Sequence, residues 1–303
     1  MLLSNNVSSK KTYFTTKHKT MKLKEIAIVV ATGAAIASTA FGQAKLTIKG
    51  SDTLGAKLVP QLKADYLKSN KGVDIEILAQ GSSHAFSNLL ADTADIGMSS
   101  RKVKQSEVDK FNVSGKKLVE HVAAWDMIAV IINEKNPVKK LSLAQIEGIF
   151  TGSITNWSEV GGKAGEISLY TRNTSSGTYK SFAKLAMSKK DYASNSQKME
   201  GNQPICTEVA NNLNGIGYVG LAYAKGNDYK TVKVDGVSAK PSKVAQYPLA
   251  RKLYYYTVGE PTSEVAAFLK YATSNDAANA IVEKIGFVPT PVANASMKAS
   301  LTQ

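Results

Sequence analysis

The sequence predicts an α/β fold with two lobes, each a mixed sheet flanked by helices, and a ligand cleft at the hinge between the lobes. Strand-like and helix-like segments alternate from residue 45 onward, a pattern typical of α/β proteins. About 260 residues follow the first 44, and chains of that length usually divide into two cores. Two segments rich in apolar, β-branched and aromatic residues, 120–132 and 248–258, favour strands that cross between the lobes.

The two crossing segments also predict how the chain is divided. Residues 45–124 and 251–303 are expected to form lobe I, so both ends of the chain build it, and residues 125–250 are expected to form lobe II. This division leaves a cleft between the lobes, which is where ligands of α/β proteins tend to bind.

Residues 1–44 are predicted to be a leader that contains a signal peptide, with Met21 as the true start. After two lysines, the apolar run 26–37 is shorter than the roughly 20 residues that a membrane-spanning helix needs, and small residues follow it. Cleavage is expected after Gly42 or Ala44, and no cysteine stands nearby to accept a lipid. The expected location is therefore the periplasm; a retained N-terminal anchor is the alternative.

Composition limits the partners. The leader holds six of the 38 basic residues and one of the 24 acidic ones, so the remainder has 32 basic and 23 acidic side chains and a net charge of +9. The lysines are scattered and do not alternate with aromatic residues, which indicates mild attraction of anions and argues against nucleic acid. Cys206 is the only cysteine, and no histidine pair has metal-ligand spacing, so neither a disulfide nor a metal site is expected.

The individual elements are predicted from the spacing of apolar residues. Leu54, Leu58, Leu62 and Tyr66 recur every four residues and predict one helix that ends near residue 72. The other strands are expected at 46–48, 73–78, 95–98, 118–132, 167–170, 215–219 and 253–258. The other helices are expected at 82–91, 106–111, 143–150, 176–187 and within the last 40 residues, with a solvated loop at 188–197.

Three segments share a pattern in which a strand is followed by small hydroxyl residues with glycine and then by a helix. They are Gly50-Ser51-Asp52-Thr53-Leu54, Gly81-Ser82-Ser83 and Ser175-Ser176-Gly177-Thr178. A helix start leaves backbone N–H groups unpaired and carries a partial positive charge, and the hydroxyls add donors. Three such starts meeting in one cleft would surround a tetrahedral oxyanion, whereas each alone could be a helix cap only.

Arg172 strengthens the oxyanion interpretation of the third segment. It ends a predicted strand four residues before Ser176, where its guanidinium could donate two parallel hydrogen bonds to a phosphate. The alternative is a structural arginine paired with a carboxylate.

Several motifs together resemble the phosphate-specific substrate-binding proteins of bacterial ABC importers. The motifs cover nearly all of the chain after the leader and are Gly50-Ser51-Asp52-Thr53-Leu54, Ala79-Gln80-Gly81-Ser82-Ser83, Ala94-Asp95-Ile96-Gly97-Met98-Ser99-Ser100-Arg101, Ile149-Phe150-Thr151-Gly152, Ile154-Thr155-Asn156-Trp157, Arg172-Asn173-Thr174-Ser175-Ser176-Gly177-Thr178, Gly215-Ile216-Gly217-Tyr218-Val219 and Tyr247-Pro248-Leu249. The resemblance implies the two-lobe fold of periplasmic binding proteins of type II, inorganic phosphate as ligand, ABC permease subunits as partners and no cofactor. A monomer is expected.

The resemblance also implies the binding residues. Phosphate would be held by the hydroxyls, backbone N–H groups and guanidinium of Thr53, Leu54, Ser82, Arg172, Ser176, Gly177 and Thr178. Another tetrahedral oxyanion, or a sensor or scavenger without its own permease, is the alternative function.

Ser100 is also predicted to bind phosphate, but it departs from the pattern, because the best-known members carry a carboxylate there. A carboxylate accepts the proton of HPO4²⁻ and repels sulfate, which has no proton to donate. Asp126 is our candidate replacement, since it interrupts an apolar segment where an unpaired carboxylate is costly. The alternative is an aspartate at a strand edge that faces water.

An enzyme is the main competing class, and the sequence argues against it. The nucleophile-elbow pattern Gly-x-Ser-x-Gly is missing, no histidine is evidently paired with a serine, and no metal cluster supports phosphate-ester hydrolysis. We therefore expect no catalytic residues.

Overall fold

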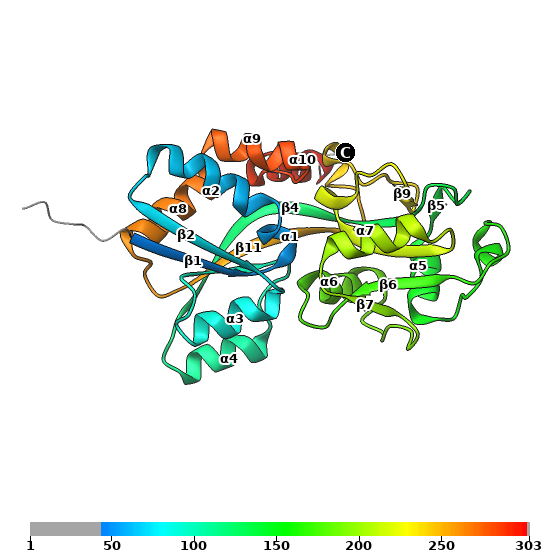
Figure 1. Ribbon diagram of the computed structural model, residues 1–303, viewed down its shortest axis with the longest axis horizontal. Helices are drawn as coiled ribbons and strands as arrows, with labels where there is room; N and C mark the ends of the chain where they lie inside the picture. Colours follow the sequence, from blue (N-terminus) through cyan, green and yellow to red (C-terminus); the bar gives the residue numbers. More distant parts are fainter. Residues whose placement is uncertain (1–43, 302–303) are drawn as a thin grey trace, which may run out of the picture. The chain divides into compact units, whose positions relative to one another are not determined.

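The computed structural model describes residues 44–301 (Figure 1). The predicted leader lies outside the described residues except for Ala44. The helices are α1 (Asp52–Gly55), α2 (Leu58–Ser69), α3 (Ser82–Leu90), α4 (Gln105–Val113), α5 (Leu143–Thr151), α6 (Gly177–Ala186), α7 (Asn202–Asn211), α8 (Ser263–Ser274), α9 (Asp276–Ile285) and α10 (Thr290–Leu301). The strands are β1 (Ala44–Gly50), β2 (Val73–Ala79), β3 (Ile96–Ser99), β4 (Leu118–Asn133), β5 (Lys140–Leu141), β6 (Ser168–Arg172), β7 (Gln197–Met199), β8 (Gly215–Gly220), β9 (Tyr229–Thr231), β10 (Lys233–Val234) and β11 (Ala250–Val258).

One mixed sheet runs through both halves of the fold. Its strand order is β2-β1-β3-β11-β4-β8-β6-β7, with β9 beside β4, and β5 and β10 form a small separate pair. The pairs β1–β2, β1–β3, β6–β7 and β6–β8 are parallel, whereas β11 and β4 run antiparallel to their neighbours. The predicted mixed α/β class is therefore confirmed.

Strand β4 joins the two halves, as its length predicted. Its first part, Leu118–Met127, pairs with β11, and its second part, Ile128–Ile132, pairs with β8. Ten of its last eleven residues are buried, all but Trp125, because helices or other strands cover this part of the strand on every side. The continuous apolar run in the sequence reflects that burial. The lobe boundaries at 124/125 and 250/251 stay a prediction.

The first helix prediction was wrong in one respect. Leu54, Leu58, Leu62 and Tyr66 are all buried, but they belong to two helices, because the chain leaves the helix after Gly55. A Cβ at Gly55 would lie 2.7 Å from Met98 Cε and 2.8 Å from Ala79 Cβ. The close approach of α1 to β2 and β3 therefore requires glycine, which weakens a helix.

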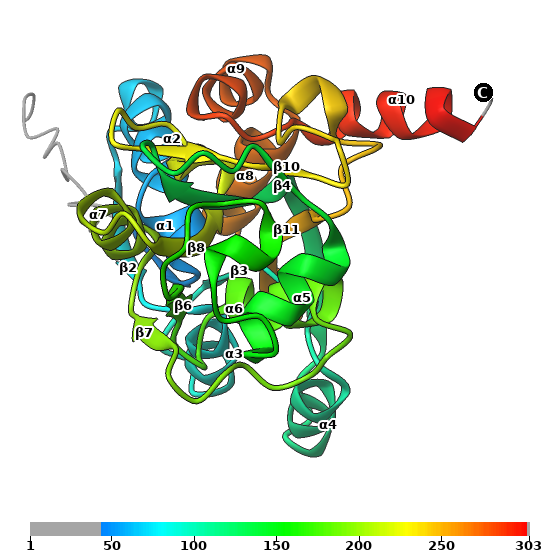
Figure 2. The same cartoon turned by 90° about the vertical axis from the view of Figure 1, so that its right-hand side faces the viewer.

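The helices cover both faces of the sheet. In the half that contains β1 and β2, α2, α8 and α9 lie on one side and α3 and α4 on the other (Figures 1 and 2). One hydrophobic core joins α2, α8 and α9 to α7, and a second core contains residues of β4, β8, α5 and α6. The predicted C-terminal helices are confirmed as α8, α9 and α10, whereas α7 was not predicted. Among residues 44–301, no helix is both long and apolar enough to cross a membrane.

Candidate functional site

The starts of α1, α3 and α6 meet, as the three hydroxyl segments predicted. The hydroxyls of Thr53 and Thr178 lie 3.0 Å apart, although 125 residues separate them in the sequence. Ser82 Oγ lies 3.2 Å from Ser100 Oγ and accepts a hydrogen bond from the Ser100 backbone N–H at 2.9 Å. Ser100 Oγ in turn lies 3.5 Å from Thr178 Oγ1. These four side chains, all at most 1% exposed, form a buried cluster that we call the hydroxyl cluster.

Glycine permits the close approach of α3 and α6. A Cβ at Gly177 would lie 2.2 Å from Ser82 Oγ, 2.9 Å from Ser82 Cβ and 2.7 Å from Ser100 Oγ. The backbone adds a direct link, because the N–H of Ser83 donates to the carbonyl of Ser175 at 3.0 Å. The two helix starts therefore lie in contact around the hydroxyl cluster.

Ser176 and Leu54 contribute in other ways than the cluster residues. Ser176 caps α6, because its hydroxyl accepts from the Tyr179 N–H at 3.2 Å, and its side chain is buried. The Leu54 side chain belongs to the first hydrophobic core, so only its backbone can serve the site. Their side chains have structural roles, and their helix starts supply N–H groups.

Arg172 ends β6 and is 1% exposed. Its Nη2 donates to the Glu200 carbonyl at 2.6 Å, and its Nη1 lies 3.4 Å from Asp52 Oδ2. Its Nε and Nη1 are buried without a hydrogen-bond partner in the described part of the chain. Burial lowers the pKa of Arg172, and the nearby Asp52 carboxylate opposes that shift. A guanidinium with unused donors can hold a further anion.

Sequence reasoning missed Asp52 and Asn202. Asp52 Oδ2 accepts hydrogen bonds from the Asn202 backbone N–H at 3.0 Å and from Asn202 Nδ2 at 2.7 Å. Asn202 Nδ2 also lies 3.4 Å from Thr53 Oγ1, and its Oδ1 accepts from the Gly220 N–H. Asn202 thus links α7 to the start of α1. Asp52 stands inside the first hydroxyl segment, which was the available signal, whereas nothing near Asn202 in the sequence indicated a site.

Asp126 is fully buried, so the alternative of an aspartate facing water is wrong. Its Oδ2 accepts from Arg251 Nη2 at 2.8 Å and from Arg251 Nε at 3.1 Å, and its Oδ1 accepts from the Leu221 N–H at 3.0 Å. A Cβ at Gly220 would lie 3.1 Å from Thr53 Cγ2 and 3.2 Å from Asp126 Oδ2. The carboxylate and Thr53 therefore both border the position that a side chain at residue 220 would fill, and glycine leaves that position open.

Arg251 connects this ion pair to the cluster, and sequence reasoning missed it although Tyr247-Pro248-Leu249 directly precedes it. Its Nη2 donates to Thr178 Oγ1 at 3.0 Å and its Nη1 to the Ser100 carbonyl at 3.1 Å. Burial raises the pKa of Asp126 and lowers that of Arg251, and the charge of each partner opposes the other's shift. Because Thr178 Oγ1 accepts from Arg251, its own proton is directed toward another acceptor.

The arrangement suits a small tetrahedral oxyanion. Hydroxyls from α1, α3, α6 and the residue after β3 form a buried cluster at three helix starts, and the unused donors of Arg172 lie beside Asp52 at the start of α1. Of the nine predicted site residues, the structure brings Thr53, Ser82, Ser100, Gly177 and Thr178 together, places Arg172 and Ser176 beside them, and gives Leu54 and Asp126 supporting positions.

Comparison with known proteins identifies relatives along most of the chain. Residues 35–276 match the family described as the PBP superfamily domain. The phosphate-binding protein PstS of Bacillus subtilis (strain 168) is 31% identical over 246 residues, which cover 80% of each chain. The protein of the same name from Pseudomonas aeruginosa is 32% identical over 272 residues, covering 81% of this chain and 83% of that protein.

Solved structures of phosphate-binding transport proteins are also similar to this chain. One is the crystal structure of a phosphate ABC transporter substrate-binding protein from Clostridium perfringens with phosphate bound. Its TM-score is 0.75 and its sequence identity is 32%, and the match covers 81% of this chain and 99% of that one. An ABC-type phosphate transport receptor from Vibrio cholerae has a TM-score of 0.66 and 27% identity, and the match covers 80% of this chain and 99% of that one. These similarities extend over nearly the whole described fold.

Proposed function

Because the chain belongs to the PBP superfamily, and within it to the family of phosphate-binding proteins, we propose that it captures inorganic phosphate and delivers it to an ABC importer. The observation that carries this proposal is the buried hydroxyl cluster next to Arg172, whose Nε and Nη1 have no hydrogen-bond partner among the described residues. Relatives that share the fold and about a third of the sequence are named as phosphate-binding proteins.

The binding residues in this proposal are those predicted from sequence. The hydroxyls of Thr53, Ser82, Ser100 and Thr178 donate to the phosphate oxygens, and Arg172 supplies a charged donor. At the starts of α1 and α6, the backbone N–H groups of Leu54 and Gly177 and the hydroxyl of Ser176 contribute. Asp126 is the proposed acceptor of the phosphate proton, and it also fixes Arg251, which donates to Thr178. Asp52 and Asn202 are added as residues that position Arg172 and Thr53.

Titration calorimetry of phosphate-free protein with phosphate, sulfate and molybdate tests this function. Phosphate should bind in a 1:1 ratio and more tightly than the other two anions. Tighter binding of sulfate or molybdate would support the alternative of another oxyanion, and no binding of any of the three would reject the proposal.

Binding without catalysis is part of the proposal. The relatives are named for binding and transport, not for an enzymatic activity. A phosphatase assay should give no turnover above that of a Ser176→Ala variant. Turnover that depends on Ser176 would show that this chain also catalyses hydrolysis.

We also propose that the chain is exported and released into the periplasm as a monomer. Mass spectrometry of the exported species should give a chain that begins near Gln43 or Lys45 and carries no lipid. A soluble product that still contains Met21 would contradict cleavage. Genes for a permease and an ATPase beside this one would favour transport over phosphate sensing.

A further inference from the structure

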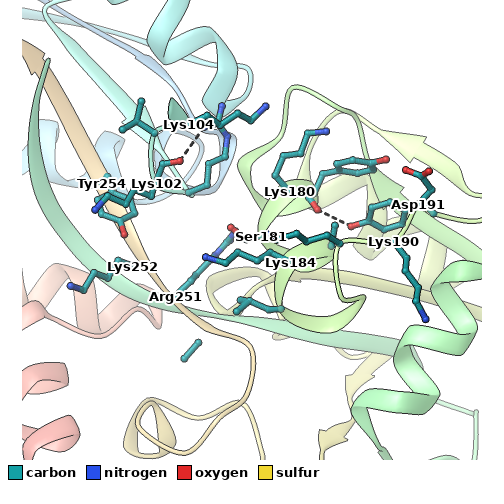
Figure 3. A pocket seen from close by; sticks show the side chains of 18 residues that line it. Lys102, Lys104, Lys180, Ser181, Lys184, Lys190, Asp191, Arg251, Lys252 and Tyr254 are labelled. Carbon is teal, nitrogen blue, oxygen red and sulfur yellow. Dashed lines mark hydrogen bonds between the residues drawn. The ribbon is translucent and has the colours of Figure 1, made fainter. Parts of the chain in front are cut away.

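A groove of about 690 Å³ lies beside the hydroxyl cluster, between the loop that follows β3 and helix α6 (Figure 3). Seven lysines and two arginines line it, against one acid, Asp191. Its floor contains Ser181 and Arg251, whose side chains both donate to the Ser100 carbonyl at 3.1 Å. The groove therefore meets Ser100 at its carbonyl, whereas the cluster contacts its N–H and hydroxyl, and Arg251, which also donates to Thr178, borders both.

Most of this positive charge is not neutralised. Arg101, Arg251 and Lys190 pair with Glu107, Asp126 and Glu147, respectively. The other six lysines form no ion pair with any carboxylate in residues 44–301: Lys102, Lys104, Lys180, Lys184, Lys189 and Lys252. Six ammonium groups around one cavity repel one another unless an anion lies between them.

The positions of these lysines increase that repulsion. Lys180 and Lys184 are four residues apart on α6, a spacing at which like charges destabilise a helix. Lys104 comes from the opposite wall, and burial, Lys104 and Arg101 lower the pKa of Lys180, whereas Asp191 raises it. Figure 3 shows lysines from both walls around the groove. Asp191 is the single acid among the residues that line the groove, so positive charge exceeds negative charge there, as a site for an anionic ligand requires.

The size and the aromatic residues of the groove define the ligand. Cavities of about 300–1,000 Å³ hold ligands much larger than one phosphate ion. Nucleotides and single-stranded nucleic acids need open aromatic faces for stacking. Here Tyr179 stacks on Tyr192 with ring centroids 4.2 Å apart and lies beneath Lys180, and Tyr254 contacts Tyr256. The lysines are therefore the groups that would recognise the ligand. They favour a ligand with repeated negative charge and no flat ring.

We propose that this groove binds a linear chain of linked phosphates, of the inorganic polyphosphate type, independently of the single-phosphate site. The lysines of both walls contact successive phosphate groups. Because flexible ammonium groups make no fixed hydrogen-bond pattern, the site selects for charge density and chain length and not for one terminal group.

Binding of short-chain inorganic polyphosphate to the intact protein, measured by calorimetry at fixed low ionic strength, tests the proposal. The variant Lys104→Gln/Lys180→Gln/Lys184→Gln should lose about tenfold or more in affinity. The control Lys71→Gln/Lys225→Gln/Lys240→Gln removes the same charge from exposed lysines outside the groove and should change affinity by less than about twofold. Equal losses in both variants would overturn the proposal, because they would mean general attraction to a basic protein.

Two further measurements separate this site from the phosphate site. An Arg172→Ala variant and saturation with orthophosphate should both leave polyphosphate binding unchanged, because neither involves the groove. Loss of polyphosphate binding in either case would place the chain in the phosphate site and contradict a second site. ATP or single-stranded DNA binding more tightly than polyphosphate would contradict the assigned ligand class.

Discussion

Two carboxylates lie close to the hydroxyl cluster, and each is held by an arginine. Sequence reasoning found Asp126, because a charge inside an apolar segment is costly, but it could not find Arg251, which pairs with it across 125 residues. Asp52 was overlooked, because a helix-start aspartate has an ordinary capping explanation. Residue type and local position thus predicted the donors, whereas ion pairs between distant segments required the fold.

Sulfate binding tests which of the two carboxylates, Asp126 or Asp52, accepts the phosphate proton. Asp126→Asn removes the charge that repels a fully ionised anion, so the preference for phosphate over sulfate should fall by about tenfold or more. Asp52→Asn should weaken the binding of both anions alike, because the Asp52 carboxylate positions Arg172. Competition of sulfate against bound phosphate measures both effects. If Asp52→Asn removes the preference and Asp126→Asn does not, Asp52 is the proton acceptor.

The Asp126–Arg251 pair also predicts a stability effect. Arg251→Ala leaves a fully buried carboxylate without its charged partner, so the free energy of unfolding should fall by about 3–5 kcal/mol. The double variant Arg251→Ala/Asp126→Ala should recover part of that loss. Denaturant unfolding measures both values. A loss below about 1 kcal/mol in the single variant would mean that the pair is not important for stability.

Among the secondary-structure elements, those with strong apolar spacing were predicted and those with mixed sequences were not. β4 was predicted from its apolar length, and α3 and α6 from hydroxyl residues that precede helical spacing. α7 was missed because it contains Pro204 and mostly polar residues, and only Ile205, Cys206 and Val209 pack in the core. The break between α1 and α2 depends on the packing of Gly55 against Met98, which no local pattern contains.

The contact between α3 and α6 gives a prediction for Gly177. Gly177→Ala places a methyl group 2.2 Å from Ser82 Oγ and 2.9 Å from Ser82 Cβ, so the two helix starts must separate. Phosphate affinity should fall by about tenfold or more, and the thermal unfolding temperature should also fall, because overpacking at a buried contact costs about 1–3 kcal/mol. Gly72→Ala, where nothing lies within 4 Å, is the matched control. Equal affinities in the two variants would contradict the role of this contact.

For the molecule as a whole, the site depends on contacts between segments far apart in the sequence. β4 and β11 connect the two halves of the sheet, and the α1, α3 and α6 starts meet beside them. An anion bound at these three helix starts contacts both halves of the sheet. Its binding energy therefore favours the arrangement in which the helix starts lie close together. The basic groove beside α6 shares only Arg251 with the residues that contact the hydroxyl cluster. The proposed second anion site would therefore adjoin the first and use mostly other side chains.

The most direct test of the account is the affinity of an Arg172→Ala variant for phosphate, measured by calorimetry on protein that retains the parent's circular dichroism and unfolding temperature. The account predicts a loss of more than about tenfold, because a charge-assisted contact in a closed site contributes about 1.5–3 kcal/mol and about 1.4 kcal/mol is a factor of ten. Unchanged affinity in the folded variant would contradict it, because Arg172 would then be structural and the phosphate would bind elsewhere.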